Sequence, residues 1–361
     1  MNQPSLPSRG KFTAIWQSET FYERDWLMRL FAPYISSHVV DGKHEVVLDN
    51  AILFDSFVYS RDPAYYQKFR GMNSFLVHLS DEFYELGHDR YLPFRGVFRT
   101  IWTSVFNPKH VMQIPLGFSA DMVPSDAKAS ERRYAWSFVG DAEKASRPDA
   151  LLALSPIEPH LCFSSTEVSG LTFFRATAKG KKKIPREDFV RYLGQSAFVP
   201  TPMGNASLES CRVYDALECG AIPIVERRMT LDYFKRLLGD HPLPTVRAWS
   251  EARELVKKLV RDPDKLDELQ QKCQAWWKHH QSVLTQEIGR FLEERSQAAD
   301  QLVPLQSRLP LLPGWNYFEL IRHHSLPALN RRVMRQIKRV TKDHKWRIAH
   351  RARNNAGGWI D

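Results

Sequence analysis

The chain has 361 residues, of which 43% are hydrophobic and 12% aromatic, enough apolar material for one or two ordinary domains. It contains no run of 18 apolar residues, so we expect no transmembrane helix, and its N-terminus lacks the apolar core of a secretion signal. Four cysteines without paired spacing argue against a disulfide framework and predict reduced thiols in a cytoplasmic protein. Of the net charge of +10, residues 331–361 carry +8.

The first third of the chain alternates apolar runs with helical patterns. The runs that predict strands lie at residues 11–16, 37–40, 52–54, 75–79 and 111–115. Helical patterns lie between them, for example at residues 21–30 and 63–69. This alternation is typical of a doubly wound parallel sheet, and we predict an N-terminal Rossmann-like acceptor domain over residues 1–128.

The polar segment 118–133 is interpreted as a linker to a second α/β domain, predicted over residues 129–297. Strands are expected at residues 134–139 and 160–163, and helices at 145–154 and 185–193. A long helix is expected from about Pro263 to Gln297, and residues 298–361 form a basic C-terminal extension.

Residues 196–225 form the most informative segment and predict a strand, a loop, a helix and a second strand. The first strand, residues 197–199, is expected to stop at Pro200 and Pro202. Ser207 is the predicted N-cap of a helix over residues 208–219 that ends at Gly220. Such a crossover between parallel strands is right-handed in nearly all proteins.

The start of this predicted helix has the features of an anion site. Gly204 lets the backbone approach a ligand, and the first-turn amides and the helix dipole attract negative charge. Arg212 is predicted to clamp a phosphate, while Asp215 or Glu209 accepts hydrogen bonds from a ribose. The alternative is that Arg212 and Asp215 form an ordinary surface ion pair.

These residues also carry a family resemblance. The pattern Phe-x-x-x-Pro-x-Gly-Asn-x-Ser-x-Glu-Ser-x-Arg-x-Tyr-Asp-Ala-Leu resembles the donor-binding segment of the exostosin-like (family 47) glycosyltransferases. The single-domain branch related to ribitol xylosyltransferase is the most similar. Further landmarks occur in family order at residues 78–82, 98–102, 114–117, 136–140 and 276–277.

The resemblance implies a GT-B arrangement of two Rossmann-like domains with a nucleotide-sugar donor and inversion at the anomeric carbon, usually without a metal. The family's arginine and acidic residue correspond to Arg212 and Asp215. Gly140 and Arg147 resemble the donor-side loop, whose arginine would offset diphosphate charge. The alternative is a plain strand-to-helix turn with a surface arginine. Together with these residues, the predicted donor site comprises Gly204, Asn205, Ser207 and Glu209.

An inverting transfer needs a general base for the acceptor hydroxyl. Asp81 and Glu82 follow a predicted strand and are the candidates, because ligands of open α/β sheets bind beyond the carboxyl ends of the strands. The alternative is that Asp81 caps a short helix and Glu82 is a solvated first-turn residue. No histidine shows metal-ligand spacing with a carboxylate, so we predict no catalytic metal and no cofactor.

The tail is the second informative region. Residues 329–347 have a basic amphipathic pattern suited to an anionic membrane surface, which would place the protein on the inner face of a membrane. A solvated tail and a helix docked on the protein's own surface are the alternatives. The basic charge alone is compatible with nucleic-acid binding, but no nucleic-acid recognition motif occurs, so we expect no nucleic-acid partner.

The sequence thus predicts an inverting glycosyltransferase that uses a glycan or lipid-linked glycan acceptor. The competing hypothesis is a non-catalytic glycan- or nucleotide-binding protein that assembles at a membrane surface.

Overall fold

A computed structural model describes residues 10–56, 63–81, 88–103, 105–164, 184–204, 207–228 and 232–298. The predicted tail, residues 329–347, lies outside the described residues, as do Glu82 and Asn205 of the predicted site. Within the described residues, no helix combines the length and the apolar character needed to cross a bilayer.

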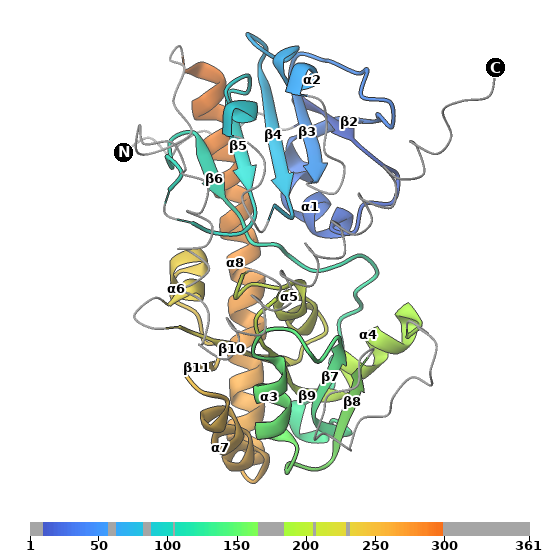
Figure 1. Ribbon diagram of the computed structural model, residues 1–361, viewed down its shortest axis with the longest axis vertical. Helices are drawn as coiled ribbons and strands as arrows, with labels where there is room; N and C mark the ends of the chain where they lie inside the picture. The colour runs from blue at the N-terminus through green and yellow to red at the C-terminus, as the bar shows by residue number, and fades with distance from the viewer. Residues whose placement is uncertain are drawn as a thin grey trace, which may run out of the picture.

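The first half of the chain forms a six-stranded parallel sheet in the order β2-β1-β3-β4-β5-β6 (Figure 1). Its strands are β1 (Phe12–Trp16), β2 (Ile35–Val40), β3 (Ala51–Ser56), β4 (Ser74–Leu79), β5 (Gly96–Arg99) and β6 (Val111–Gln113). Strands β3, β4 and β5 are buried along their whole length, as expected for a sheet covered on both faces. The helical segments here are α1 (Arg24–Phe31), η1 (Ala32–Tyr34), α2 (Pro63–Gln67) and η3 (His88–Tyr91).

The second half forms a five-stranded parallel sheet in the order β11-β10-β9-β7-β8. Its strands are β7 (Tyr134–Gly140), β8 (His160–Ser164), β9 (Ser196–Thr201), β10 (Ile222–Glu226) and β11 (Thr245–Val246). The predicted stop of strand β9 is wrong at Pro200, which pairs with Ile224 inside the sheet, and is confirmed at Pro202, because β9 ends at Thr201. Thr201 compensates nearby, since its hydroxyl donates to the Ile224 carbonyl at 2.7 Å.

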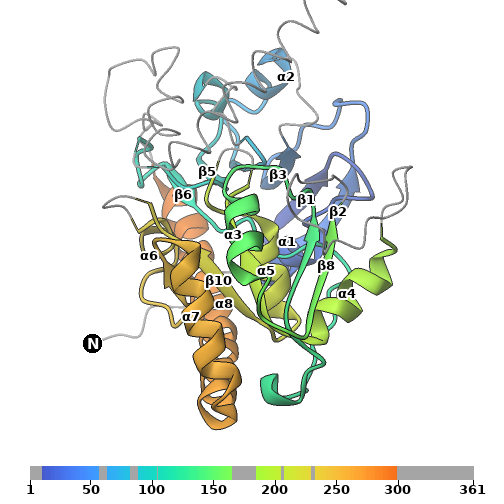
Figure 2. The ribbon, with the colours of Figure 1, turned by 60° about the horizontal axis from the view of Figure 1, so that its bottom comes forward.

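Helices cover the second sheet and join it to the first. They are η4 (Ala129–Glu131), α3 (Arg147–Leu154), α4 (Arg186–Gly194), α5 (Cys211–Glu218), α6 (Tyr233–Leu238), α7 (Trp249–Val260) and α8 (Pro263–Gln297). Helix α8 has the predicted bounds, because Asp262 accepts from the Lys265 amide as N-cap and Pro263 occupies the first helical position. In both ribbon views α7 and α8 lie side by side (Figure 2).

Helix α8 packs along both sheets rather than only the second (Figure 1). Its Trp277 stacks on Trp26 of α1 with ring centroids 5.3 Å apart, and Phe291 contacts Phe98 of β5 at 5.1 Å. The Tyr34 hydroxyl also donates to the Thr285 carbonyl at 2.7 Å. One hydrophobic cluster therefore runs through both halves and holds the sheets against each other. The predicted boundary at residues 128 and 129 lies in the segment that connects β6 to β7.

Candidate functional site

The loops that follow the strands of the two sheets meet each other. Leu116, just after β6, donates its amide to a Glu209 carboxylate oxygen at 2.7 Å, and Glu209 belongs to the loop between β9 and α5. Similarly, the Trp102 amide after β5 donates to the hydroxyl of Tyr233, which lies after β10, at 2.8 Å. Because carboxyl ends of parallel strands are where open α/β sheets bind ligands, this junction is the candidate site.

The loop between β9 and α5 has a tight local structure. The Gly204 amide donates to the Ser207 carbonyl at 2.9 Å, and the Ser207 hydroxyl accepts from the Glu209 amide at 3.0 Å. A Cβ at Gly204 would lie only 3.2 Å from the Glu209 carbonyl, so a larger residue would crowd the turn. The prediction that Ser207 caps the helix is wrong: α5 begins at Cys211, and extended Ser210 is its N-cap.

The physical reason for the late helix start is the burial of Glu209. Its carboxylate accepts from the hydroxyls of Tyr214 and Tyr233 at 2.6 and 2.7 Å, besides the Leu116 amide. These contacts hold residues 207–210 away from helical geometry. They leave the Ser210 hydroxyl buried without a hydrogen-bond partner at the N-terminus of α5, where unpaired amides favour an anion.

Arg212 lies in the first turn of α5 and reaches across to the end of β7. Its guanidinium donates to the Val139 carbonyl at 3.0 Å and lies 4.6 Å from the ring centroid of Phe138. Burial lowers its pKa, so the positive charge is held at a desolvation cost. Among the described residues, no carboxylate lies within ion-pair distance of this guanidinium.

Gly140 makes room for Arg212. Its φ is +146°, and a Cβ there would lie 2.7 Å from an Arg212 terminal nitrogen. Only glycine therefore allows this approach between the β7 terminus and the guanidinium. The structure brings Gly140 and Arg212 together, as the predicted donor site requires.

Asp215 is 2% exposed, and one of its carboxylate oxygens accepts from the amide and hydroxyl of Ser119 at 2.8 and 2.7 Å. The alternative of a surface ion pair with Arg212 is therefore wrong. Burial raises the pKa of Asp215, against the hydrogen bonds from Ser119 and the charges of Arg186 and Arg212 that lower it. The carboxylate anchors the segment that links the two sheets.

A second buried carboxylate, which the sequence did not single out, joins three loops of the second sheet. Glu226 at the end of β10 accepts from the Ser146 hydroxyl at 2.5 Å and from the Met203 amide at 2.8 Å. Its other oxygen accepts from Trp249 and Arg228 at 3.0 and 2.8 Å. The loops after β7, β9 and β10 are thus fixed relative to one another.

Arg147 begins α3, directly after this Ser146 anchor, and is 7% exposed. Its guanidinium donates to the Asp141 carbonyl at 2.7 Å, one residue beyond Gly140. The alternative of a surface arginine is therefore wrong, and Arg147 lies in the same loop region as Gly140.

On the first sheet, Asp81 is 2% exposed and bound to Arg99, whose guanidinium lies 3.3 Å from its carboxylate and 2.8 Å from its carbonyl. Arg99 also lies 3.3 Å from Nδ1 of His78, and the Tyr91 hydroxyl lies 2.6 Å from the same nitrogen. Because arginine can only donate, Nδ1 accepts and the ring proton sits on Nε2. Burial and the neighbouring arginines lower the pKa of His78, which stays neutral.

A carboxylate that sequence reasoning missed lies on the same edge. Glu23, in the loop between β1 and α1, is 7% exposed, and the Ser80 hydroxyl lies 3.5 Å from one of its oxygens. Burial raises the pKa of Glu23, and the hydrogen bonds from its own amide and Ser80 only partly offset this. Ser80 itself has φ +62°, a strained conformation typical of functional sites.

The neighbouring Tyr22 shows which way this loop faces. Its carbonyl accepts from the Ala120 amide at 2.9 Å. The Asp121 amide likewise donates to the Asp25 carboxylate at 3.0 Å. The loop that carries Glu23 therefore packs against the segment that links the two sheets. No local pattern signalled this, because a glutamate at a helix start is ordinary.

No group of three or more His, Cys, Asp or Glu side chains suited to a metal ion occurs in the part of the chain that the structure describes.

Comparison with protein families gives one match. Residues 118–296, just under half of the chain, match the family described as the RXYLT1 C-terminal domain. This region contains the second sheet, α5 and nearly all of α8. It agrees with the resemblance to the ribitol xylosyltransferase branch, whereas the wider exostosin-like family stays a prediction. No curated protein matches the chain in sequence.

Solved structures show the fold. A crystal structure of the DNA-modifying enzyme β-glucosyltransferase aligns with a TM-score of 0.50 at 11% identity, over 80% of this chain and all of that one. HepE from Anabaena, with UDP and glucose, aligns with a TM-score of 0.47 at 10% identity, over 78% and 100% of the chains. Sucrose-phosphate synthase from Thermosynechococcus elongatus gives 0.45 at 11% identity, over 67% and 73%. The predicted GT-B arrangement is confirmed.

Proposed function

We propose that this protein is an inverting glycosyltransferase that moves a sugar from a nucleotide-sugar donor to a glycan or lipid-linked glycan acceptor. The observation that carries the proposal is Arg212, a partly buried and partly desolvated guanidinium at the start of α5 that is held by a backbone carbonyl rather than by a carboxylate. A partly buried cation of this kind is stabilised when an anion binds beside it.

The donor diphosphate would lie between Arg212 and the N-terminus of α5. Because Gly140 and Gly204 have no Cβ, the diphosphate can approach the backbone there, and the Ser210 hydroxyl can donate a hydrogen bond to it. Arg147 adds positive charge beside Gly140. Glu209 and Asp215, predicted as ribose contacts, act in this proposal as positioning residues, because tyrosine hydroxyls bind both oxygens of Glu209 and Ser119 binds one oxygen of Asp215 twice.

The general base in this proposal is Glu23 rather than Asp81. Arg99 engages Asp81 directly, whereas the only side-chain hydrogen bond that Glu23 makes with a described residue, Ser80, is long. A carboxylate whose pKa is raised toward the working pH is also the stronger base. Glu82, the other predicted base, lies outside the described residues.

The reaction is one displacement. The acceptor oxygen forms a bond to the anomeric carbon while its proton passes to the Glu23 carboxylate. The bond from the anomeric carbon to the diphosphate oxygen breaks, and the leaving diphosphate takes the electron pair. Its charge is balanced by Arg212 and the α5 dipole, and a single displacement inverts the anomeric configuration. These groups supply the charge, so the proposal requires no metal.

UDP-sugars are the first donors to test. The β-glucosyltransferase structure was determined with and without its substrate uridine diphosphoglucose, and HepE structures contain UDP-glucose. The experiment measures the melting temperature of the purified protein with UDP-, GDP-, CMP- and dTDP-sugars, together with Arg212→Ala. We expect one nucleotide class to raise the melting temperature of the wild type but not of the variant.

The same panel distinguishes the non-catalytic alternative. A donor that binds but is never hydrolysed or transferred would favour a binding protein, and the absence of any donor-dependent shift would overturn the proposal. Adding EDTA to an active preparation tests the metal-free mechanism, for which we expect an unchanged rate.

A further inference from the structure

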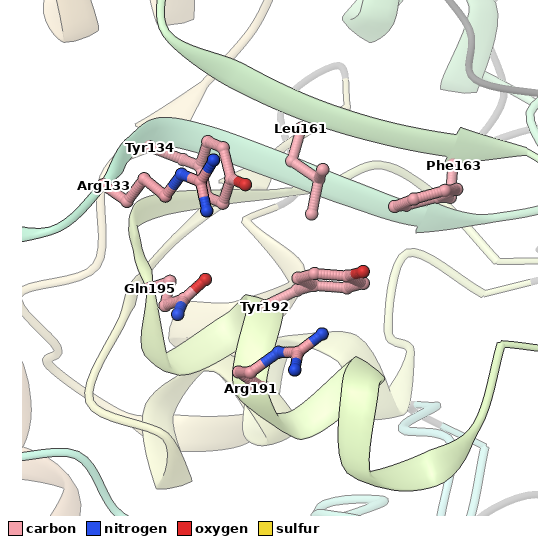
Figure 3. A pocket seen from close by; sticks show the side chains of 7 residues that line it. All are labelled: Arg133, Tyr134, Leu161, Phe163, Arg191, Tyr192 and Gln195. Atoms are coloured by element: carbon pink, nitrogen blue, oxygen red, sulfur yellow. The ribbon is translucent and has the colours of Figure 1, made fainter.

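A cavity of about 330 Å³ lies on the flank of the second sheet, between β8 and helix α4. Figure 3 shows that the side chains around the cavity come from strands β7 and β8 and helix α4 or from the residues next to them. None of the residues that line it belongs to the candidate donor site. Strand β8 is the edge strand of the described sheet, and none of the lining residues belongs to the first sheet.

The aromatic part of the cavity is preformed. Phe163 of β8 and Tyr192 of α4 stack with ring centroids 5.4 Å apart and an angle of 22° between the rings. Both side chains are partly exposed, while Leu161 beside them is buried. Rings fixed in this way present an apolar surface at little conformational cost, which suits the C–H face of a sugar ring.

The polar part of the cavity is cationic. The Arg133 and Arg191 guanidiniums each lie 5.2 Å from the ring centroid of the adjacent tyrosine, Tyr134 and Tyr192 respectively. Arg191 is paired with Asp188 at 2.6 Å, whereas Arg133 has no carboxylate within 4.0 Å among the described residues. Stacking on a ring holds a guanidinium in place with its N–H groups directed outward.

We propose that this cavity binds an acidic saccharide, with a sugar ring against Phe163 and Tyr192 and its carboxylate or phosphate on Arg133. Gln195, on the cavity wall, supplies an amide that can bond to sugar hydroxyls. A nucleobase fits less well, because the two stacked rings leave no gap in which a flat base can insert. The site goes beyond the proposed transfer reaction and needs no donor.

Binding of an oligogalacturonate hexamer to the full chain, measured by calorimetry without any nucleotide sugar, tests the proposal. A neutral maltohexaose and mannose 6-phosphate are the comparison ligands. We expect the two anionic ligands to bind and the neutral one to bind at least tenfold more weakly. Arg133→Ala and Tyr192→Ala should each weaken oligogalacturonate binding about tenfold.

Arg236→Ala is the matched control, because it removes one exposed arginine from α6 and changes the net charge equally. Equal losses in Arg133→Ala and Arg236→Ala would assign the binding to general charge attraction and overturn the proposal. Failure of both anionic ligands to bind, or displacement of the oligogalacturonate by a nucleoside monophosphate, would also overturn it. Arg212→Ala should bind the saccharide like the wild type, so this result is independent of the donor site.

Discussion

At the facing edges of the two sheets, where the carboxyl ends of their strands meet, opposite kinds of charge are paired within the protein. On the second sheet, the carboxylates of Glu209 and Asp215 are hydrogen-bonded to protein groups, while the Arg212 guanidinium contacts, among the described residues, only a backbone carbonyl and a ring. On the first sheet, the Arg99 guanidinium is bound by an acidic partner, while the Glu23 carboxylate has a single, long side-chain hydrogen bond within the part of the chain that the structure describes.

This contrast distinguishes charged side chains with a structural role from charged side chains that are candidates for binding a ligand. A buried charge with a complete set of partners is compatible with structure alone. A desolvated charge without an opposite charge costs free energy in the empty protein and is therefore a candidate functional group. The second edge offers a cation to the donor diphosphate, and the first offers a carboxylate to the acceptor proton.

The largest expected effect follows from removing the carboxylate of the first edge. Glu23→Gln keeps the shape and the Ser80 contact but cannot accept a proton. We expect the rate of transfer, or of slow donor hydrolysis, to fall about 10²–10⁴-fold while donor affinity is unchanged. Release of the nucleoside diphosphate measures the rate, and Glu19→Gln in the same loop is the matched control with an exposed glutamate.

The pH profile sharpens this prediction. The pKa of Glu23 is raised by burial, so in the wild type kcat/KM should fall as the pH drops through a value above the usual 4.5 of a glutamate. Glu23→Gln should lose this acidic limb. If the limb persists in the variant, another group acts as the base.

The next effect removes the cation of the second edge. Arg212→Ala should raise the activation free energy by about 2–4 kcal/mol, which lowers the rate roughly 30–1000-fold, because the leaving diphosphate loses a preorganised partner. Arg212→Lys should recover only part of this, since an ammonium keeps the charge but lacks the planar fork with which a guanidinium donates two parallel hydrogen bonds to a phosphate. An unchanged rate in a folded Arg212→Ala protein would show that the donor binds elsewhere.

A smaller effect tests the space beside Arg212. Gly140→Ala places a Cβ 2.7 Å from the guanidinium at a φ that side chains rarely adopt, so Arg212 must move. We expect donor affinity, measured by titration, to fall about tenfold in a protein that still folds. Gly42→Ala, where no atom lies within 4 Å, is the control and should bind like the wild type.

Local sequence signals predicted the elements whose determinants are local. Helix α8 was predicted from about Pro263 to Gln297 by its apolar periodicity, and the observed bounds agree because its N-cap, Asp262, and its first residue, Pro263, are adjacent in the sequence. The start of α5 was missed because Ser207 resembles an N-cap, and what delays the helix is the burial of Glu209 against Leu116, 93 residues away. No sequence window contains that contact.

The candidate site divides in the same way. Arg212 was predicted from the glycine turn and helix start that precede it, and Gly140 and Arg147 from the family resemblance; the structure places all three near one another, and their roles stay predictions. Glu23 was not predicted, because its environment is made by a loop after another strand, at Ser80. The residues that make the two edges different have partners in distant segments of the chain. A local sequence pattern cannot reveal those partners.

The smallest expected effect, a change in stability, comes from replacing the hydrogen-bonded carboxylate of Asp215. Asp215→Asn keeps a carbonyl oxygen to accept from the amide and hydroxyl of Ser119, so we expect stability to change by no more than about 1 kcal/mol at pH 7. The pKa of Asp215 is raised in the folded state, chiefly by burial, so the folded protein binds more protons than the unfolded chain above pH 3.8.

The wild type should therefore lose stability relative to Asp215→Asn as the pH rises from 3.8 through the raised pKa, and the difference should then stay constant. Urea unfolding of both proteins between pH 3.5 and 7 measures it. A wild type that instead gains on the variant with rising pH would mean that Arg186 and Arg212 attract the ionised carboxylate more strongly than burial opposes it. Arg212 would then already have its opposite charge in Asp215, and the contrast between the two edges would fail at the residue on which the donor site depends.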